Sequence, residues 1–165
     1  MKSILVLRCP PPALMHALLE QTCELATLLP HMESARVLER QVAHGRVSIR
    51  QQWRVRVNVP ALLQPHLEDG LQEWVLTLQY ATGESLAHWQ AESAALQASG
   101  GCRGSLRFAP ALGGLGTRVE LDCEVPVAND GLRLMIGNLL QRHWRTLAEA
   151  AAANIAAARS AAPAG

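Results

Sequence analysis

The stretch RVSIRQQWRVRV, residues 46–57, decides the fold. Every second side chain from Val47 to Val57 is apolar except Gln51, whereas the alternate positions hold arginine, serine or glutamine. A period of two residues is typical of a β-strand that has one buried and one solvated face. We therefore predict a strand over residues 46–57, with an arginine-rich face toward water.

Further strands are predicted on both sides of this segment. Residues 74–80 and 118–127 show the same alternation, and weaker patterns cover residues 4–7, 35–42, 86–92 and 102–108. Short turns that contain glycine lie between most of these strands, at residues 44–45, 82–83, 100–101 and 113–114. Connections of this kind favour antiparallel hairpins over helical crossovers. Residues 58–70 form a longer loop, of a length that is more often functional or mobile than incidental.

The C-terminal segment changes to a helical period. Its apolar residues recur at spacings of three and four, as in Leu132, Met135, Ile136 and Leu139, which predicts an amphipathic helix. Asp130 is the predicted N-cap, and the helix should reach roughly 25 residues, or nearly 40 Å. Two short helices are predicted near the N-terminus, over residues 13–20 and 24–29, with Pro30 ending the second.

Composition narrows the class of protein. The chain has 165 residues, of which 49% are hydrophobic and 18% charged, and its net charge of +1 argues against a nucleic-acid-binding surface. No apolar run has the length of a membrane span or of a signal-peptide core. Its four cysteines lack the spacing of a zinc site, so we expect reduced thiols, no metal, no cofactor and a cytoplasmic location. We expect one domain over residues 1–159, followed by a frayed tail over 160–165.

The order of these elements resembles a known superfamily. The resemblance is carried by Pro10-Pro11-Pro12 before the first helix, by residues 28–39, by the Trp53 strand, by residues 104–108 and by residues 116–121. The chain is similar to the START-like, polyketide cyclase/dehydrase and lipid-transport (SRPBCC) superfamily. This resemblance implies an α+β helix-grip fold, in which a curved antiparallel sheet of about seven strands wraps around a long C-terminal helix. Similar proteins hold lipids, polyketides, quinones or plant hormones between sheet and helix, and some of them catalyse cyclisation, dehydration or hydrolysis.

The predicted ligand-binding residues are those on the inward faces of the strands and of the last helix. They are Gln51, Trp53, Val55, Trp74, Leu76, Leu78, Tyr80, Trp89, Leu106, Phe108, Met135, Leu139 and His143. Gln51 is the one polar residue on its strand face, and its amide either orients a ligand or bonds to a neighbour in the core. His143 is either a core histidine or a general acid/base. The tryptophans either pack the core or line a cavity, and the two roles are compatible.

Three functions remain open at this stage. The first is binding of a small hydrophobic ligand, and the second is a cyclase- or dehydratase-type enzyme acting on such a ligand. The enzyme needs at least two converging polar groups, such as Gln51 with His143 or with Tyr80. The third is a protein-interaction module that uses the outer arginines at positions 46, 50, 54 and 56, either with a protein partner or in a homodimer. Alternatively, these arginines pair with the acidic residues at 120, 122 and 124.

Overall fold

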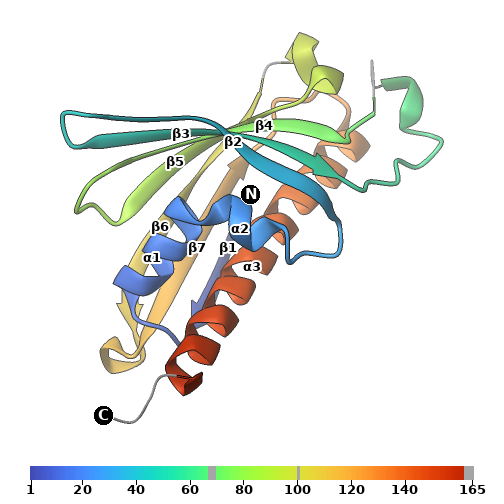
Figure 1. The fold of residues 1–165 in the computed structure, drawn as a ribbon. Coiled ribbons are helices and arrows are strands. Elements are labelled where there is room, and N and C mark those ends of the chain that lie inside the picture. The colour runs from blue at the N-terminus through green and yellow to red at the C-terminus, as the bar shows by residue number, and fades with distance from the viewer. Residues whose placement is uncertain (67–69, 100, 162–165) are drawn as a thin grey trace.

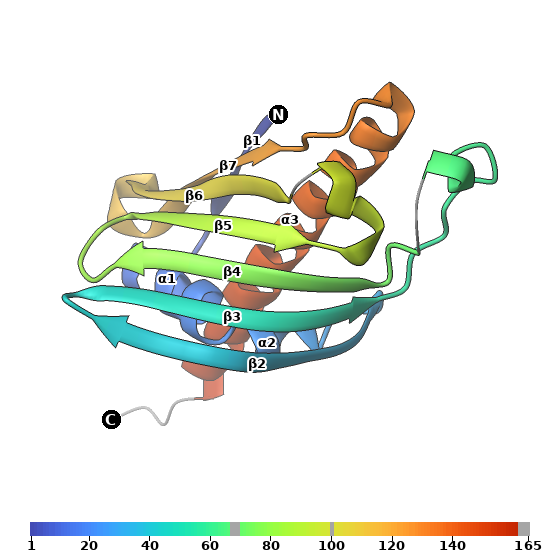
Figure 2. The same cartoon turned by 90° about the horizontal axis from the view of Figure 1, so that it is seen from above.

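The computed structural model describes residues 1–66, 70–99 and 101–161. A curved sheet of seven strands wraps around one long helix, α3, and the short helices α1 and α2 lie on the same side of the sheet (Figures 1 and 2). The predicted α+β class and helix-grip architecture are therefore confirmed. The elements are β1 (Lys2–Leu7), α1 (Pro11–Glu20), α2 (Thr22–Ala26), β2 (Met32–Ala43), β3 (Arg46–Val55), β4 (Glu73–Ala81), β5 (Leu86–Glu92), β6 (Cys102–Ala111), β7 (Gly116–Glu124) and α3 (Asp130–Ala161). Three short 3-10 turns join them, η1 (Gln64–His66), η2 (Ala94–Ser99) and η3 (Leu112–Gly114).

The strands pair in the order β1-β7-β6-β5-β4-β3-β2, and every pair is antiparallel. From β2 to β7 each strand pairs with the next one along the chain, as the turn signals predicted. The first strand, β1, instead pairs with β7, so the N-terminal segment lies beside the strand that leads into α3. The first and the last strand of the chain therefore lie next to each other, at the edge of the sheet that precedes α3.

The alternation in β3 is confirmed by its burial. Val47, Ile49, Gln51, Trp53 and Val55 are buried, and the intervening side chains are exposed or half-buried. The strand ends at Val55, two residues earlier than predicted. Just beyond this end, the N–H of residue 56 still donates to the carbonyl of residue 31 at 2.8 Å, next to the Met32–Val55 pair of β2 and β3.

The boundaries of α3 differ from the prediction. Asn129, not Asp130, is the N-cap, because its Oδ1 accepts the N–H of Leu132 at 2.9 Å. Asp130 belongs to the first turn and pairs with Arg133. The helix has 32 residues, about 48 Å at 1.5 Å per residue, so it is longer than predicted. It includes Ser160 and Ala161, which were expected to fray, and residues 162–165 lie outside the described residues.

Smaller corrections concern the connecting segments. Helix α2 ends at Ala26 rather than next to Pro30, and in the turns that follow the N–H groups of Leu28 and Leu29 donate to carbonyls three residues back. The predicted long loop after β3 is present over its described residues 58–66 and 70; residues 67–69 lie outside them. The glycines of these turns were expected to supply positive φ. Gly45, Gly83, Gly113 and Gly114 do so, Gly101 does not, and Gly100 lies outside the described residues.

The outer arginines pair differently from the prediction. Three strands separate β3 from β7, so the arginines of β3 lie too far from residues 120, 122 and 124 to pair with them. Arg54 instead bonds to Glu33 at 2.9 Å and to Glu73 at 2.7 Å. Glu120 and Glu124 pair with arginines of β6 and β7. All these pairs are exposed and contribute little to stability.

The core lies between the concave face of the sheet and the helices. The buried face of α3 presents Leu132, Ile136, Leu140, Trp144 and Leu147 to it. Burial of apolar surface on this scale is the main force that holds the sheet on α3. No helix within the described residues combines the length and the apolar character that crossing a membrane would require.

Gly104 of β6 makes room for a tryptophan in this core. It pairs with Trp89 across β5 and β6 and has the same inward parity as the buried residues of its strand. A Cβ at position 104 would lie 2.5 Å from Cζ2 of Trp89 and 2.0 Å from the carbonyl oxygen of Asp122. Both distances are below van der Waals contact, so only glycine fits while the indole keeps its place.

Gly104→Ala should therefore destabilise the fold. We expect the free energy of unfolding to fall by about 1–3 kcal/mol, which is typical of overpacking a core. Gly101→Ala is the matched control, because its added Cβ meets first the flexible side chain of Glu92, at 2.9 Å, and should change stability by less than about 0.5 kcal/mol. Urea denaturation measures both variants. Equal stabilities for Gly104→Ala and the wild type would contradict this account of the Trp89 site.

Candidate functional site

The predicted ligand-binding residues lie in the layer between the sheet and α3. Ten of them are at most 4% exposed, namely Gln51, Trp53, Val55, Trp74, Leu76, Leu78, Trp89, Leu106, Phe108 and His143. Tyr80, Met135 and Leu139 are half-buried and pack against the same core. The sheet parity and the helix period therefore bring these residues to one interior.

Four rings form a cluster in the middle of this interior. Trp53, Trp89, His143 and Trp144 make up this aromatic cluster, with ring centroids 4.1 Å apart for Trp53 and His143 and 5.9 Å apart for Trp89 and Trp144. The centroids of Trp53 and Trp144 are 6.1 Å apart. Trp144 was missing from the predicted set. Its position four residues after Leu140 and three before Leu147 places it on the apolar stripe and could have identified it.

The amide of Gln51 serves the core. Its Oε1 accepts the indole N–H of Trp53 at 3.0 Å and the thiol of Cys23 at 3.4 Å. A second indole is also satisfied, because Trp74 Nε1 donates to the carbonyl of Leu71 at 2.9 Å. Of the two roles considered for Gln51, the bond to a core neighbour is the one for which the structure provides contacts.

Three other buried side-chain nitrogens lack a hydrogen-bond partner in the described part of the chain. Trp89 Nε1, Trp144 Nε1 and His143 Nε2 have no hydrogen-bond partner among the residues that the structure describes. We call them the interior nitrogens. A buried polar atom without a partner costs about 1–3 kcal/mol, so a fold rarely keeps several of them in one place without a use. An indole nitrogen only donates, so the two tryptophans call for an acceptor.

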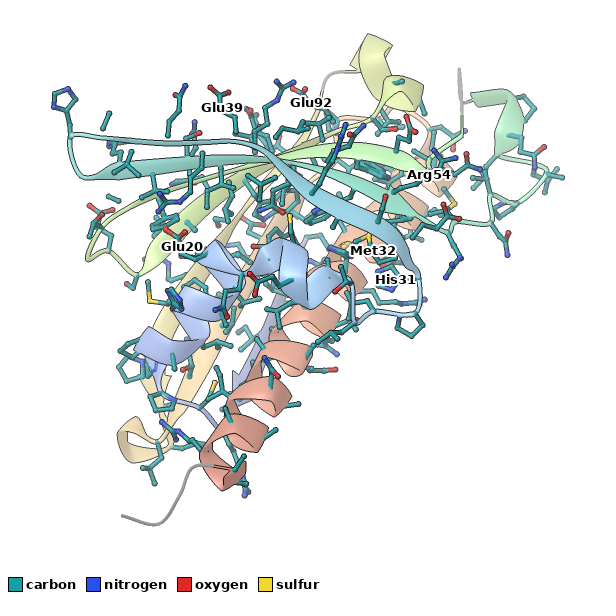
Figure 3. The ribbon with its side chains drawn as sticks, in the orientation of Figure 1. Glu20, His31, Met32, Glu39, Arg54 and Glu92 are labelled. Atoms are coloured by element: carbon teal, nitrogen blue, oxygen red, sulfur yellow. The ribbon has the colours of Figure 1, made fainter. Side chains whose placement is uncertain are left out.

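His143 is joined to the surface through a second histidine. Its Nδ1 lies 3.0 Å from Nε2 of His31, which is half-buried in the segment between α2 and β2. Figure 3 shows His31 beside α3, at the start of β2. Burial, and then the nearby His31, lower the pKa of His143 to about 3. Burial and then Arg142 lower the pKa of His31. Both imidazoles are thus neutral at pH 7, and one ring donates to the other.

Tyr80 has its own partners at the other end of the interior. Its hydroxyl donates to Glu20 at the end of α1, and Arg40 of β2 binds the same carboxylate through two bonds of 3.1 Å. The hydrogen bond from Arg40 is the main cause that lowers the pKa of Glu20, and burial raises the pKa of Tyr80. Figure 3 labels Glu20 where α1 faces the sheet. This cluster holds α1 against the sheet, and it occupies the hydroxyl that the predicted Gln51–Tyr80 pair would need.

Four half-buried apolar side chains pack against the core from α3 and from the segment after β3. Val57 and Val59 follow β3, and Met135 and Leu139 lie on α3, two turns and one turn before His143 respectively. A Cβ on Gly131 would lie 3.2 Å from Leu63, so the loop after β3 approaches the first turn of α3. We call the set Val57, Val59, Met135 and Leu139 the mouth.

The outer face of the sheet also has a hollow. A pocket of about 410 Å³ is lined by polar residues of β4 to β7, including His88, Ser105 and Asp122. These three lie side by side across neighbouring strands. However, Ser105 lies between the other two, so Asp122 cannot orient the imidazole as a catalytic triad requires. Asp122 instead accepts the N–H of Cys123 at 3.0 Å.

Comparisons with known proteins give a fold. No protein-family model matches the chain, and no curated protein matches it. Among solved structures, the protein TTHA0849 of Thermus thermophilus is 20% identical, with a TM-score of 0.64 over 96% of this chain and 97% of that one. The 18 kDa protein CC1736 of Caulobacter crescentus is 15% identical, with a TM-score of 0.64 over 98% of each chain. Norcoclaurine synthase of Thalictrum flavum, solved in complex with dopamine and hydroxybenzaldehyde, is 12% identical, with a TM-score of 0.63 over 94% of this chain and 84% of that one.

These likenesses agree with the topology described above. They confirm the helix-grip fold that the sequence predicted. At identities of 20% or less they establish the fold alone, because one fold serves many functions.

Removing the amide of Gln51 should destabilise the core. Gln51→Leu leaves the indole N–H of Trp53 without its acceptor, so we expect a loss of about 1–3 kcal/mol in the free energy of unfolding. Gln52→Leu, on the opposite face of the same strand, is the matched control and should cost less than about 0.5 kcal/mol. Chemical denaturation with tryptophan fluorescence as the signal distinguishes them. Equal effects at the two positions would contradict the assigned role of Gln51.

Stability should also depend on pH through His143. Because its pKa is about 3 in the folded protein and about 6.5 when exposed, the unfolded chain binds the additional proton below pH 6.5. Stability is therefore full above pH 6.5 and falls on acidification toward pH 3, with a slope from His143 of up to about 1.4 kcal/mol per pH unit.

We expect His143→Gln to flatten this slope between pH 6.5 and about 5.5, where carboxylates of ordinary pKa stay ionised. His88→Gln, on the exposed outer face, should keep the wild-type slope. Urea unfolding at four pH values in this window gives both slopes. A wild-type slope in His143→Gln would show that the buried imidazole is not the group responsible.

Proposed function

We propose that this protein binds a small, largely apolar molecule between the concave face of the sheet and α3. The single observation that carries the proposal is the group of interior nitrogens, two indole donors and an imidazole nitrogen within an apolar layer. A ligand that is apolar over most of its surface and carries one or two acceptors would match that layer in both respects.

The mouth gives such a molecule a way in. Met135 and Leu139 are half-buried on α3 within two turns of His143, and Val57 and Val59 are half-buried against the same core. Methionine adapts its shape easily, so Met135 can move aside at low cost. The fold is a further support, since norcoclaurine synthase, which shares it, has been solved with two small aromatic molecules.

The outer arginines provide weaker support for a protein-interaction role. Of these four, Arg54 and Arg56 both pair with Glu33. An arginine whose charge is already paired within the protein offers little unpaired charge for a protein partner to bind. Ligand binding is therefore the function that the arrangement of residues favours.

Blocking the mouth should abolish binding. The apolar dye 1-anilinonaphthalene-8-sulfonate should gain fluorescence with the folded wild type, and Leu139→Trp should weaken its affinity at least tenfold. Leu134→Trp adds the same side chain at a position of α3 that is 58% exposed and should leave the affinity unchanged. Native mass spectrometry of the purified protein serves as a second readout for a bound molecule.

The two readouts together decide the proposal. Equal dye affinities in Leu139→Trp and Leu134→Trp would place the dye elsewhere. A folded wild type that neither binds the dye nor carries a molecule in the mass spectrum would refute ligand binding.

A further inference from the structure

We infer that His31 and His143 form a proton relay, through which the interior catalyses proton transfer at the carbon beside the carbonyl group of an apolar ketone. This inference rests on the proposed function, because the ketone must occupy the layer between the sheet and α3. It goes beyond binding by giving that layer a reaction and each polar group a role.

The geometry of the two rings carries the inference. His143 Nδ1 and His31 Nε2 are 3.0 Å apart, although 112 positions separate the two residues in sequence. His143 is 3% exposed, whereas His31 is half-buried and reaches the surface. The carbonyl of His31 accepts the N–H of Arg56 at 2.8 Å, which fixes the segment that carries the outer ring. Two imidazoles in contact therefore connect water with the apolar interior.

The far nitrogen of the inner ring is placed to act on a ligand. Within the described residues, His143 Nε2 is buried and has no hydrogen-bond partner. A histidine that served only the core would use both nitrogens, as Trp53 and Gln51 use their polar atoms. The ring of Trp53 lies against that of His143, with centroids 4.1 Å apart, and limits its rotation. A general base needs this combination of a free lone pair and a fixed orientation.

The relay moves a proton without leaving a charge on either ring. In the resting state His143 Nδ1–H donates to His31 Nε2, and His143 Nε2 is unprotonated. The ketone's α-proton passes to His143 Nε2, the Nδ1 proton of His143 passes to His31 Nε2, and the Nδ1 proton of His31 passes to water. The enolate then leaves the layer and takes its proton from a solvent water. The hydroxide so formed accepts the Nε2 proton of His143 while the relay runs in reverse, His31 Nε2 returns a proton to His143 Nδ1 and water returns one to His31 Nδ1, so both rings regain their resting tautomers. The electron pair of the broken C–H bond becomes the enolate, so no oxidant or reductant is needed. Burial disfavours an imidazolium at position 143, and a concerted relay never requires one.

The indole donors supply the other half of the chemistry. Trp144 follows His143 in the helix, with ring centroids 6.3 Å apart, and Trp89 lies against Trp144. Their N–H groups, for which the described residues provide no acceptor, would bond to the enolate oxygen as its charge develops. Fixed donors in an apolar site stabilise such an anion more than water does. His143 is then the catalytic base, Trp89 and Trp144 are the oxyanion donors, and His31 is the positioning residue that passes the proton on.

Hydrogen–deuterium exchange of 2-tetralone, an apolar ketone, tests this inference. In D₂O at pD 7, proton NMR follows the loss of its α-proton signals, and quenching of tryptophan fluorescence measures its binding separately. We expect the wild type to accelerate exchange at least tenfold over buffer and His143→Gln to abolish the acceleration. His31→Ala should reduce the acceleration at least tenfold at unchanged tetralone affinity, and added imidazole should restore it. His88→Gln should behave as the wild type.

The outcomes separate the relay from ligand binding. Binding of tetralone without faster exchange overturns the relay and leaves the proposed function intact, and so does an undiminished rate in His31→Ala. Absence of tetralone binding would count against the proposed function. The relay is then decided on the free protein by ¹⁵N NMR of the histidine rings. A proton on Nδ1 of His143 with a bare Nε2 supports the base, and a proton on Nε2 at pH 7 overturns it.

Discussion

Burying a polar atom in an apolar layer costs free energy unless that atom finds a partner, and this constraint governs the interior of the protein. All four tryptophans of the chain are buried between the sheet and the helices. Two of their N–H groups are matched, one by the Gln51 amide and one by the Leu71 carbonyl. The N–H groups of Trp89 and Trp144 have no acceptor in the described part of the chain. Because the N–H groups of Trp89 and Trp144 lack, among the described residues, the acceptors that Trp53 and Trp74 have, this part of the core is a candidate ligand site.

The fold positions this site between two polar clusters. At one end, Tyr80, Glu20 and Arg40 hold α1 to the sheet. At the other end, His31 reaches from the segment before β2 to His143 of α3. Gly104 allows the sheet to bring Trp89 into the layer between the two clusters. The interior is therefore apolar along its walls, and its polar groups are concentrated at the aromatic cluster.

Much of this architecture could be predicted from local pattern. Alternation in residues 46–57 identified β3 and its inward residues, and the spacing of Leu132, Ile136 and Leu140 identified α3, because burial imposes the period of each element on its sequence. Boundaries were less predictable. The cap of α3 is Asn129 rather than Asp130, since either side chain suits the position and only the backbone geometry decides.

The polar contacts of the site could not be predicted in the same way. His31 and His143 are 112 positions apart, and no local period records their approach. The pairing of the outer arginines failed for a related reason, because it required the strand order and not only the strands. Trp144 shares the apolar stripe of α3, yet its unsatisfied N–H becomes evident only when every neighbour is in place. The apolar residues that line the interior could thus be predicted from local sequence, whereas its polar contacts required the tertiary structure.

The central claim is that Trp89 and Trp144 keep their N–H groups for a ligand, and the indole region of a ¹H–¹⁵N NMR spectrum tests it most directly. The four tryptophans give four indole signals, which single Trp→Phe variants assign. On titration with 2-tetralone, the account predicts that the Trp89 and Trp144 signals shift downfield as their N–H groups bond to the ketone oxygen. The N–H groups of Trp53 and Trp74 keep their acceptors and should shift much less. Four unchanged signals at saturating ketone, or shifts confined to Trp53 and Trp74, would contradict the account.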